Sequence, residues 1–142
     1  MARVPDAFVR LLGSIPLFSS VSKKGLRALV VATDQIEVAP GKVIVREGGY
    51  DRDFFVIVSG SVRVSRKGRK LATLGPGDFF GEISLVGPGP RTATVTAETD
   101  TKLLLLGPQR FRVVVDHEPA IAHSIMEKMG ERLRASERAI SH

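Results

Sequence analysis

The stretch Leu74–Val95, with the sequence LGPGDFFGEISLVGPGPRTATV, contains the features that most constrain the fold. Gly81 stands where a β-rich run ends, and Glu82–Leu85 is long enough for one turn of helix. Arg91 opens the next β-rich run, nine residues after Glu82. Short β-rich runs separated by glycine turns are typical of an antiparallel barrel or jelly roll.

The same stretch has the residue types that bind an anion. Free N–H groups at the start of a short helix favour a phosphate, and Gly81 and Ser84 would let a ligand approach the backbone closely. The guanidinium of Arg91 can hold two phosphate oxygens at once. The carboxylate of Glu82 can accept a hydrogen bond from a ribose hydroxyl. The sequence therefore predicts a phosphate-binding segment at Phe80–Val95.

The predicted β-roll spans residues 34–107. Eleven of the 14 glycines lie between residues 41 and 107, where they separate six short β-rich runs. These runs are Lys42–Val45, Phe54–Val58, Ser61–Ser65, Lys70–Leu74, Thr92–Ala97 and Thr101–Leu106. The apolar residues Val62, Val64 and Leu71 predict a half-buried hairpin with Lys67 and Gly68 in its turn.

Helical segments flank the β-roll in the sequence. Apolar residues at helical spacing in residues 1–33 predict two short helices, with Asp6 and Ser22 as N-caps. Pro108 suits the first turn of another helix, in which Val113 and Val114 would face inward, and a longer helix follows. We expect a single domain over residues 1–142, with helices at 1–33, the mainly β core at 34–107 and two helices at 108–142.

The predicted last helix has one apolar face. The apolar positions recur at steps of three or four residues: Ile121, Ala122, Ile125, Met129, Leu133, Ser136 and Ile140. The opposite face carries Glu127, Lys128, Glu131, Arg134 and Arg138. Core packing explains this stripe, and a homodimer seam through the last helix is the alternative.

Two motifs in this order resemble the cyclic nucleotide-binding domain family, which includes bacterial catabolite activators, kinase regulatory subunits and gated channels. The phosphate-binding cassette of that family is similar to Phe80–Leu85 (FGEISL) and Arg91–Val95 (RTATV). The second motif is Glu47–Gly49 (EGG) followed by Phe54–Val62 (FFVIVSGSV). The segment Ile15–Phe18 and the last two helices also fit, so the resemblance covers nearly the whole chain.

The resemblance implies a ligand-binding role for particular residues. Arg91 would hold the exocyclic phosphate oxygens. The other phosphate and ribose contacts would come from Gly81, Glu82, Ile83, Ser84, Thr92 and Ala93. The apolar wall around the ribose and base would be Val64, Leu71, Ala72 and Phe80. The last helix would close over the base as a lid, with Leu133, Ala135 and Ser136 nearest.

The resemblance also implies a switch without catalysis. Ligand binding would order the cassette, move a hinge near Phe111 and fold the last helix down. The expected ligand is cAMP, with cGMP as a second choice because Thr92 is compatible with both. The sequence departs from the family in the Gly- and Pro-rich loop Gly87–Pro90 and in Ala135, which has no hydrogen-bonding side chain.

Structural roles are the alternative for the same residues. Arg91 could pair with Glu82 without any ligand, Glu82 could only cap a helix, and Gly81 could only form a turn. An orphan domain of the same fold, acting as a protein–protein interaction module, is the alternative function.

The net charge of +6 attracts phosphates and acidic surfaces. Five basic residues fall within eight positions: Arg63, Arg66, Lys67, Arg69 and Lys70. This cluster is interpreted as a solvated hairpin tip or as a contact for an acidic partner. We expect no specific DNA binding, because no helix-turn-helix or aromatic stacking platform is present.

Other function classes are disfavoured by what the chain lacks. There is no cysteine, and the histidines are His117, His123 and His142, all outside the predicted β-roll, so a cupin-like metal enzyme is not expected. No apolar run approaches the roughly 20 residues of a membrane span, and no signal peptide is expected. We therefore expect a cytoplasmic domain without cofactor or metal that acts alone or through a separate effector.

Overall fold

The computed structural model describes residues 6–15, 18–81 and 89–140. The chain forms two compact units. The β unit is Val31–Phe111, and the helical unit combines Met1–Val30 with Arg112–His142.

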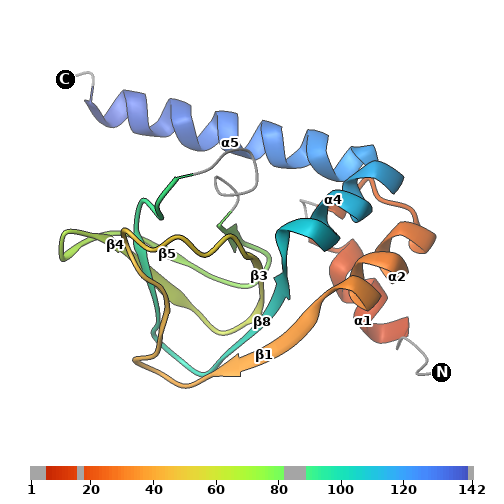
Figure 1. Cartoon of the computed structure of the whole chain (residues 1–142), viewed down its shortest axis with the longest axis horizontal. Helices are drawn as coiled ribbons and strands as arrows, with labels where there is room; N and C mark the ends of the chain where they lie inside the picture. Colours follow the sequence, from red (N-terminus) through yellow and green to blue (C-terminus); the bar gives the residue numbers. More distant parts are fainter. Residues whose placement is uncertain (1–5, 16–17, 82–88, 141–142) are drawn as a thin grey trace. The chain divides into compact units, whose positions relative to one another are not determined.

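The β unit consists of two four-stranded antiparallel sheets (Figure 1). The first sheet has the order β1-β8-β3-β6 and the second has the order β2-β7-β4-β5. The strands are β1 (Asp34–Val38), β2 (Val43–Val45), β3 (Phe54–Ser59), β4 (Val62–Arg66), β5 (Arg69–Leu74), β6 (Phe79–Phe80), β7 (Thr94–Ala97) and β8 (Thr101–Leu106). The predicted fold class, an antiparallel β-roll with flanking helices, is confirmed.

All six predicted β-rich runs contain a strand, but two strands were not predicted. Strand β1 is polar and mostly exposed, so it has no apolar alternation to signal it. Strand β6 has only two residues and pairs with Phe55 and Val56. The predicted run at Thr92–Ala97 begins at Thr94 instead. The carbonyl of Thr92, just before the strand, accepts a hydrogen bond from Arg66 Nε at 2.9 Å.

The hydrophobic core of the β unit draws on both sheets. It consists of Val45, Phe55, Ile57, Val62, Phe80, Val95 and Leu103. The rings of Phe55 and Phe80 stack with centroids 4.8 Å apart. This stack fixes β6 against β3, and β6 ends immediately before Gly81.

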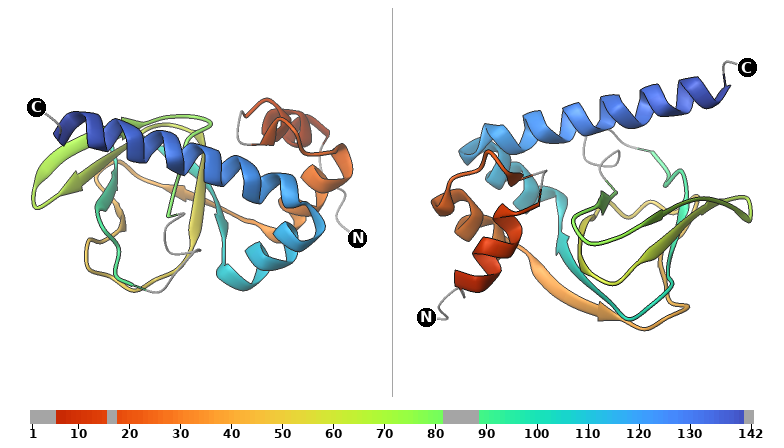
Figure 2. Two further views of the ribbon diagram at one scale, coloured as in Figure 1. Left: turned by 90° about the horizontal axis from the view of Figure 1, so that it is seen from above. Right: turned by 180° about the vertical axis from the view of Figure 1, so that it is seen from behind.

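The β4–β5 hairpin carries the basic cluster of the sequence. Lys67 and Gly68 form its turn, with φ angles of 50° and 77°. The position of the turn is as the sequence predicted, and two consecutive residues with positive φ match a type I′ turn. The hairpin (yellow-green) extends beyond the neighbouring strands of its unit in all three ribbon views (Figures 1 and 2).

The helical unit contains parts or all of four helices: α1 (Asp6–Gly13), α2 (Lys23–Ala32), α4 (Pro108–His117) and α5 (Pro119–Ile140). Ser22 caps α2 as predicted, since its Oγ accepts a hydrogen bond from the Gly25 N–H at 3.0 Å. The same hydroxyl donates to Glu118 Oε1 at 3.1 Å. The N-terminus of α2 is thus tied to the junction between α4 and α5.

Two predictions about the C-terminal helices need correction. Val113 is 57% exposed, whereas Val114 is buried, because a step of about 100° places neighbours on different helix faces. In α5 the predicted apolar stripe is buried at Ile121 and Ile125, but Leu133 is 62% exposed. Among the described helices, none combines the length and apolarity needed to cross a membrane.

A matched pair of leucines tests the assignment of the core. Leu103 is 1% exposed and Leu71 is 53% exposed. We expect Leu103→Ala to lower the free energy of unfolding by about 2–5 kcal/mol, and Leu71→Ala to change it by about 0.5 kcal/mol or less. Urea unfolding followed by circular dichroism measures both. Equal losses in the two variants would contradict the core assignment.

Candidate functional site

Arg91 lies in the β unit, just before β7, and is 6% exposed. Its Nη2 donates to Asp51 Oδ2 and to the backbone carbonyl of Asp53, each at 2.6 Å. The backbone is fixed as well: its N–H donates to the Gly49 carbonyl at 2.7 Å, and its carbonyl accepts from the Gly48 N–H at 2.8 Å. The loop between β2 and β3 therefore holds both the backbone and the side chain of Arg91.

This β2–β3 loop is itself anchored to the second sheet. The N–H of Glu47 donates to Thr94 Oγ1 at 3.0 Å, and the carboxylate of Glu47 accepts from the Lys67 N–H at 2.9 Å. The two motifs noted in the sequence, Glu47–Gly49 and the segment around Arg91, are thus one structural element. The contacts that join them bridge about forty residues of sequence, for example from Gly49 to Arg91.

One N–H group of the Arg91 guanidinium donates to no described residue. Its Nε is buried and has no hydrogen-bond partner among the residues that the structure describes. Leaving a buried donor unpaired costs roughly 1–3 kcal/mol, and more for a charged group. A ligand that brings anionic oxygens to this position would remove that cost.

Gly81 explains how the guanidinium reaches the Asp53 carbonyl. Its φ is +89°, and a Cβ added there would lie 2.5 Å from the Asp53 carbonyl oxygen and 2.8 Å from Arg91 Nη1. A side chain at position 81 would therefore collide with the contact that orients Arg91. The predicted role for this glycine was close approach of a ligand, and the structure shows close approach of Arg91 itself.

Two acidic residues at the site were not predicted. Asp51 and Asp53 lie at the end of the β2–β3 loop, and burial, followed by the charge of Asp51, raises the pKa of Asp53 while Arg91 lowers it. The sequence feature that could have indicated these two acids is the triplet Asp51–Asp53 (DRD), which lies between a glycine turn and the apolar strand β3. Among the described residues, the acid that pairs with Arg91 is Asp51. The alternative pairing of Arg91 with Glu82 involves a residue outside the described part of the chain.

Two residues of the predicted apolar wall lie opposite each other on neighbouring strands. Val64 on β4 is opposite both Ala72 on β5 and Val95 on β7. Leu71 is more than half exposed, and Phe80 is buried in the core stack with Phe55. Their predicted contacts with a base stay predictions.

The remaining predicted site residues lie in three places: beside Arg91, on α5, or outside the described residues. Thr92 is exposed and Ala93 is half-buried, directly after Arg91. Leu133 and Ala135 are exposed on α5 in the helical unit. Glu82, Ile83, Ser84 and the side chain of Ser136 lie outside the described residues, so their roles stay predictions.

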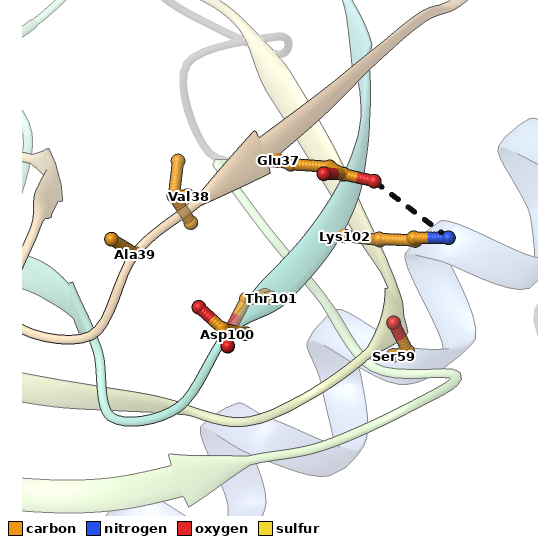
Figure 3. A pocket seen from close by; sticks show the side chains of 7 residues that line it. All are labelled: Glu37, Val38, Ala39, Ser59, Asp100, Thr101 and Lys102. Atoms are coloured by element: carbon orange, nitrogen blue, oxygen red, sulfur yellow. Dashed lines mark ion pairs between the residues drawn. The ribbon is translucent and has the colours of Figure 1, made fainter.

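The β unit has a pocket whose lining includes none of the predicted site residues. It has a volume of about 460 Å³ and is lined by Glu37, Val38, Ala39, Ser59, Asp100, Thr101 and Lys102 (Figure 3). The Lys102 ammonium lies 3.7 Å from the Glu37 carboxylate, and both side chains are exposed. With two acids and one already paired cation, this pocket is a poor phosphate receptor.

Comparison with known proteins finds relatives over most of this chain. A family profile described as cyclic nucleotide-binding domain matches residues 35–118. A cyclic nucleotide-gated potassium channel of Rhizobium etli is 37% identical over 128 residues, which cover 88% of this chain and 36% of the channel. A CRP-like cAMP-activated global transcriptional regulator of Mycobacterium tuberculosis is 28% identical, over 87% of this chain and 58% of the regulator.

The solved structures give the same result. The catabolite activator protein of Thermus thermophilus superposes with a TM-score of 0.81 and 30% identity, over 88% of this chain and 61% of that one. This chain therefore belongs to the cyclic nucleotide-binding domain family. It spans less than two thirds of each of these three relatives.

Replacing Gly81 by alanine tests the packing around Arg91. Gly41 is the matched control, because its φ of +86° is nearly the same and nothing would lie within 4 Å of its added Cβ. The control should lose about 1–2 kcal/mol of stability from backbone strain alone. Gly81→Ala should lose about 1–3 kcal/mol more, through overpacking. Equal losses in urea unfolding would contradict the contact described here.

Proposed function

We propose that this chain is a regulatory domain that binds a cyclic nucleotide, with the cyclic phosphate on the guanidinium of Arg91. The observation that carries the proposal is the buried Nε of Arg91, which has no partner among the described residues. Membership of the family supports the proposal, as do relatives described as cAMP-activated or cyclic nucleotide-gated.

The chemistry of the site fits a cyclic phosphate. Such a phosphate has two exocyclic oxygens that share one negative charge, and a guanidinium can bind both through two parallel N–H groups. The hydroxyl of Thr92 is exposed beside Arg91 and can donate to the same group. We further propose, from the family resemblance, that Gly81, Glu82, Ile83 and Ser84 supply the other phosphate and ribose contacts.

The proposed output is a movement of the C-terminal helices. The carbonyl that orients Arg91 belongs to Asp53, and the ring of the next residue, Phe54, lies 5.6 Å from the ring of Phe111. Phe111 is the last residue of the β unit. A ligand that alters the contacts of Arg91 can therefore affect the point where the chain leaves this unit. The α5 residues Leu133, Ala135 and Ser136 are the proposed lid.

The finer features of the function remain predictions from the sequence. They are a preference for cAMP over cGMP, a cytoplasmic location, a separate effector protein, a homodimer through α5 and the absence of catalysis. The alternative is an orphan domain that binds a protein partner and no nucleotide. Calorimetric titration with cAMP and with cGMP separates these alternatives and ranks the two bases.

The decisive variant is Arg91→Ala. We expect its affinity for cAMP to be about 100-fold lower or worse, because removing one member of a buried charge pair costs about 3–5 kcal/mol. Arg91→Lys should also bind weakly, since lysine keeps the charge but loses the planar fork. Isothermal titration calorimetry of nucleotide-stripped protein measures both.

The matched control is Arg63→Ala, which removes the same charge from an exposed position on β4. It should bind like the parent protein. Circular dichroism checks that every variant is folded. Parent-like affinity in a folded Arg91→Ala variant would overturn the proposed site.

A further inference from the structure

The ion pair between Arg91 and Asp51 is asymmetric in its exposure to solvent. The Arg91 side chain is 4% exposed and the Asp51 side chain is 42% exposed. The guanidinium is therefore fixed inside the β unit, while the carboxylate reaches it from the solvent side. Of the two partners, Asp51 is the one whose own charge can move into solvent, provided that another anion takes its place on the buried guanidinium.

The Nη2 atom of Arg91 is already saturated. It has two N–H groups, and its two acceptors are the Asp51 carboxylate and the Asp53 carbonyl, each at 2.6 Å. A guanidinium offers two edges for a two-point contact, Nη1 with Nη2 and Nε with Nη2, and both include Nη2. A phosphate that binds Arg91 through two oxygens must therefore displace one of these acceptors.

The backbone carbonyl of Asp53 is the less replaceable of the two acceptors. It belongs to the residue immediately before β3, and Gly81 has no Cβ that would collide with it. The Asp51 carboxylate is a half-exposed side chain in a loop. The phosphate and the Asp51 carboxylate are also both anionic, so they compete for the same charge.

Resting on the proposed function, we infer that Asp51 is a built-in competitor for Arg91 and sets the affinity of the site for a cyclic phosphate. In the ligand-free protein Asp51 neutralises the buried guanidinium. When the nucleotide binds, its phosphate takes the Nη2 contact and Asp51 turns into solvent. The cluster of Arg91, Asp51 and Asp53 carries one positive and up to two negative charges, which further opposes an incoming anion.

The test is a calorimetric titration of Asp51→Asn with cAMP, beside the parent protein. Asparagine keeps the size of the side chain and removes its charge, so we expect affinity to rise about tenfold, the equivalent of about 1.4 kcal/mol. A gain in affinity is a result that a merely structural role for Asp51 would not produce. Unchanged or weaker binding in a folded Asp51→Asn variant would overturn the inference.

Two control variants separate competition from general charge effects. Asp51→Glu keeps the competing carboxylate and should bind far more weakly than Asp51→Asn. Asp100→Asn removes an equal charge at the turn between β7 and β8 and should bind like the parent. A tenfold gain in Asp100→Asn would attribute the effect to net charge and overturn the inference.

The outcomes distinguish this inference from the proposed function. If the parent binds cAMP and Asp51→Asn gains nothing, the inference alone fails. If the parent shows no binding but Asp51→Asn does, the inference stands and the parent is held in a non-binding state by Asp51. If neither protein binds cAMP or cGMP, both the inference and the proposed function fail.

Discussion

A buried guanidinium needs acceptors on every side that water cannot reach, and the site is organised around that requirement at Arg91. The β2–β3 loop meets it in part through the Asp53 carbonyl and the Asp51 carboxylate, and it fixes the backbone of Arg91 through Gly48 and Gly49. The remaining Nε has no partner among the described residues. The same contacts thus stabilise the loop, and none of those described uses Nε.

Within the β unit, the Arg91 guanidinium contacts the residue that precedes a core strand. Strand β3 follows Asp53 directly and contributes Phe55 and Ile57 to the core. Phe54, on the same strand, contacts the rings of both Phe79 and Phe111. The residue whose carbonyl orients Arg91 is therefore followed directly by a strand packed in the core. This connection gives the proposed switch a physical route as far as the end of the β unit.

The sequence predicted those features that depend on local chemistry. Gly81 was predicted to be a point of close approach, and it lies against Arg91, although the predicted neighbour was a ligand. The hairpin turn at Lys67 and Gly68 follows from turn preferences. The phosphate-binding role of Arg91 stays a prediction. The pairing of Arg91 with Asp51 depends on how a loop forty residues away folds, so residue patterns did not reveal it. Strand β1 was missed because its residues are polar and mostly exposed. Both Val113 and Val114 were predicted to face inward, although neighbouring helix positions lie on different faces.

The central claim is that Arg91 is the receptor for the phosphate of a cyclic nucleotide, and a crystal structure of the complex with cAMP tests it most directly. The account predicts a phosphate oxygen within hydrogen-bonding distance of Arg91 Nε, with the Asp51 carboxylate no longer on Nη2. A complex in which cAMP occupies another part of the molecule, while Arg91 keeps its contact with Asp51, would contradict the account.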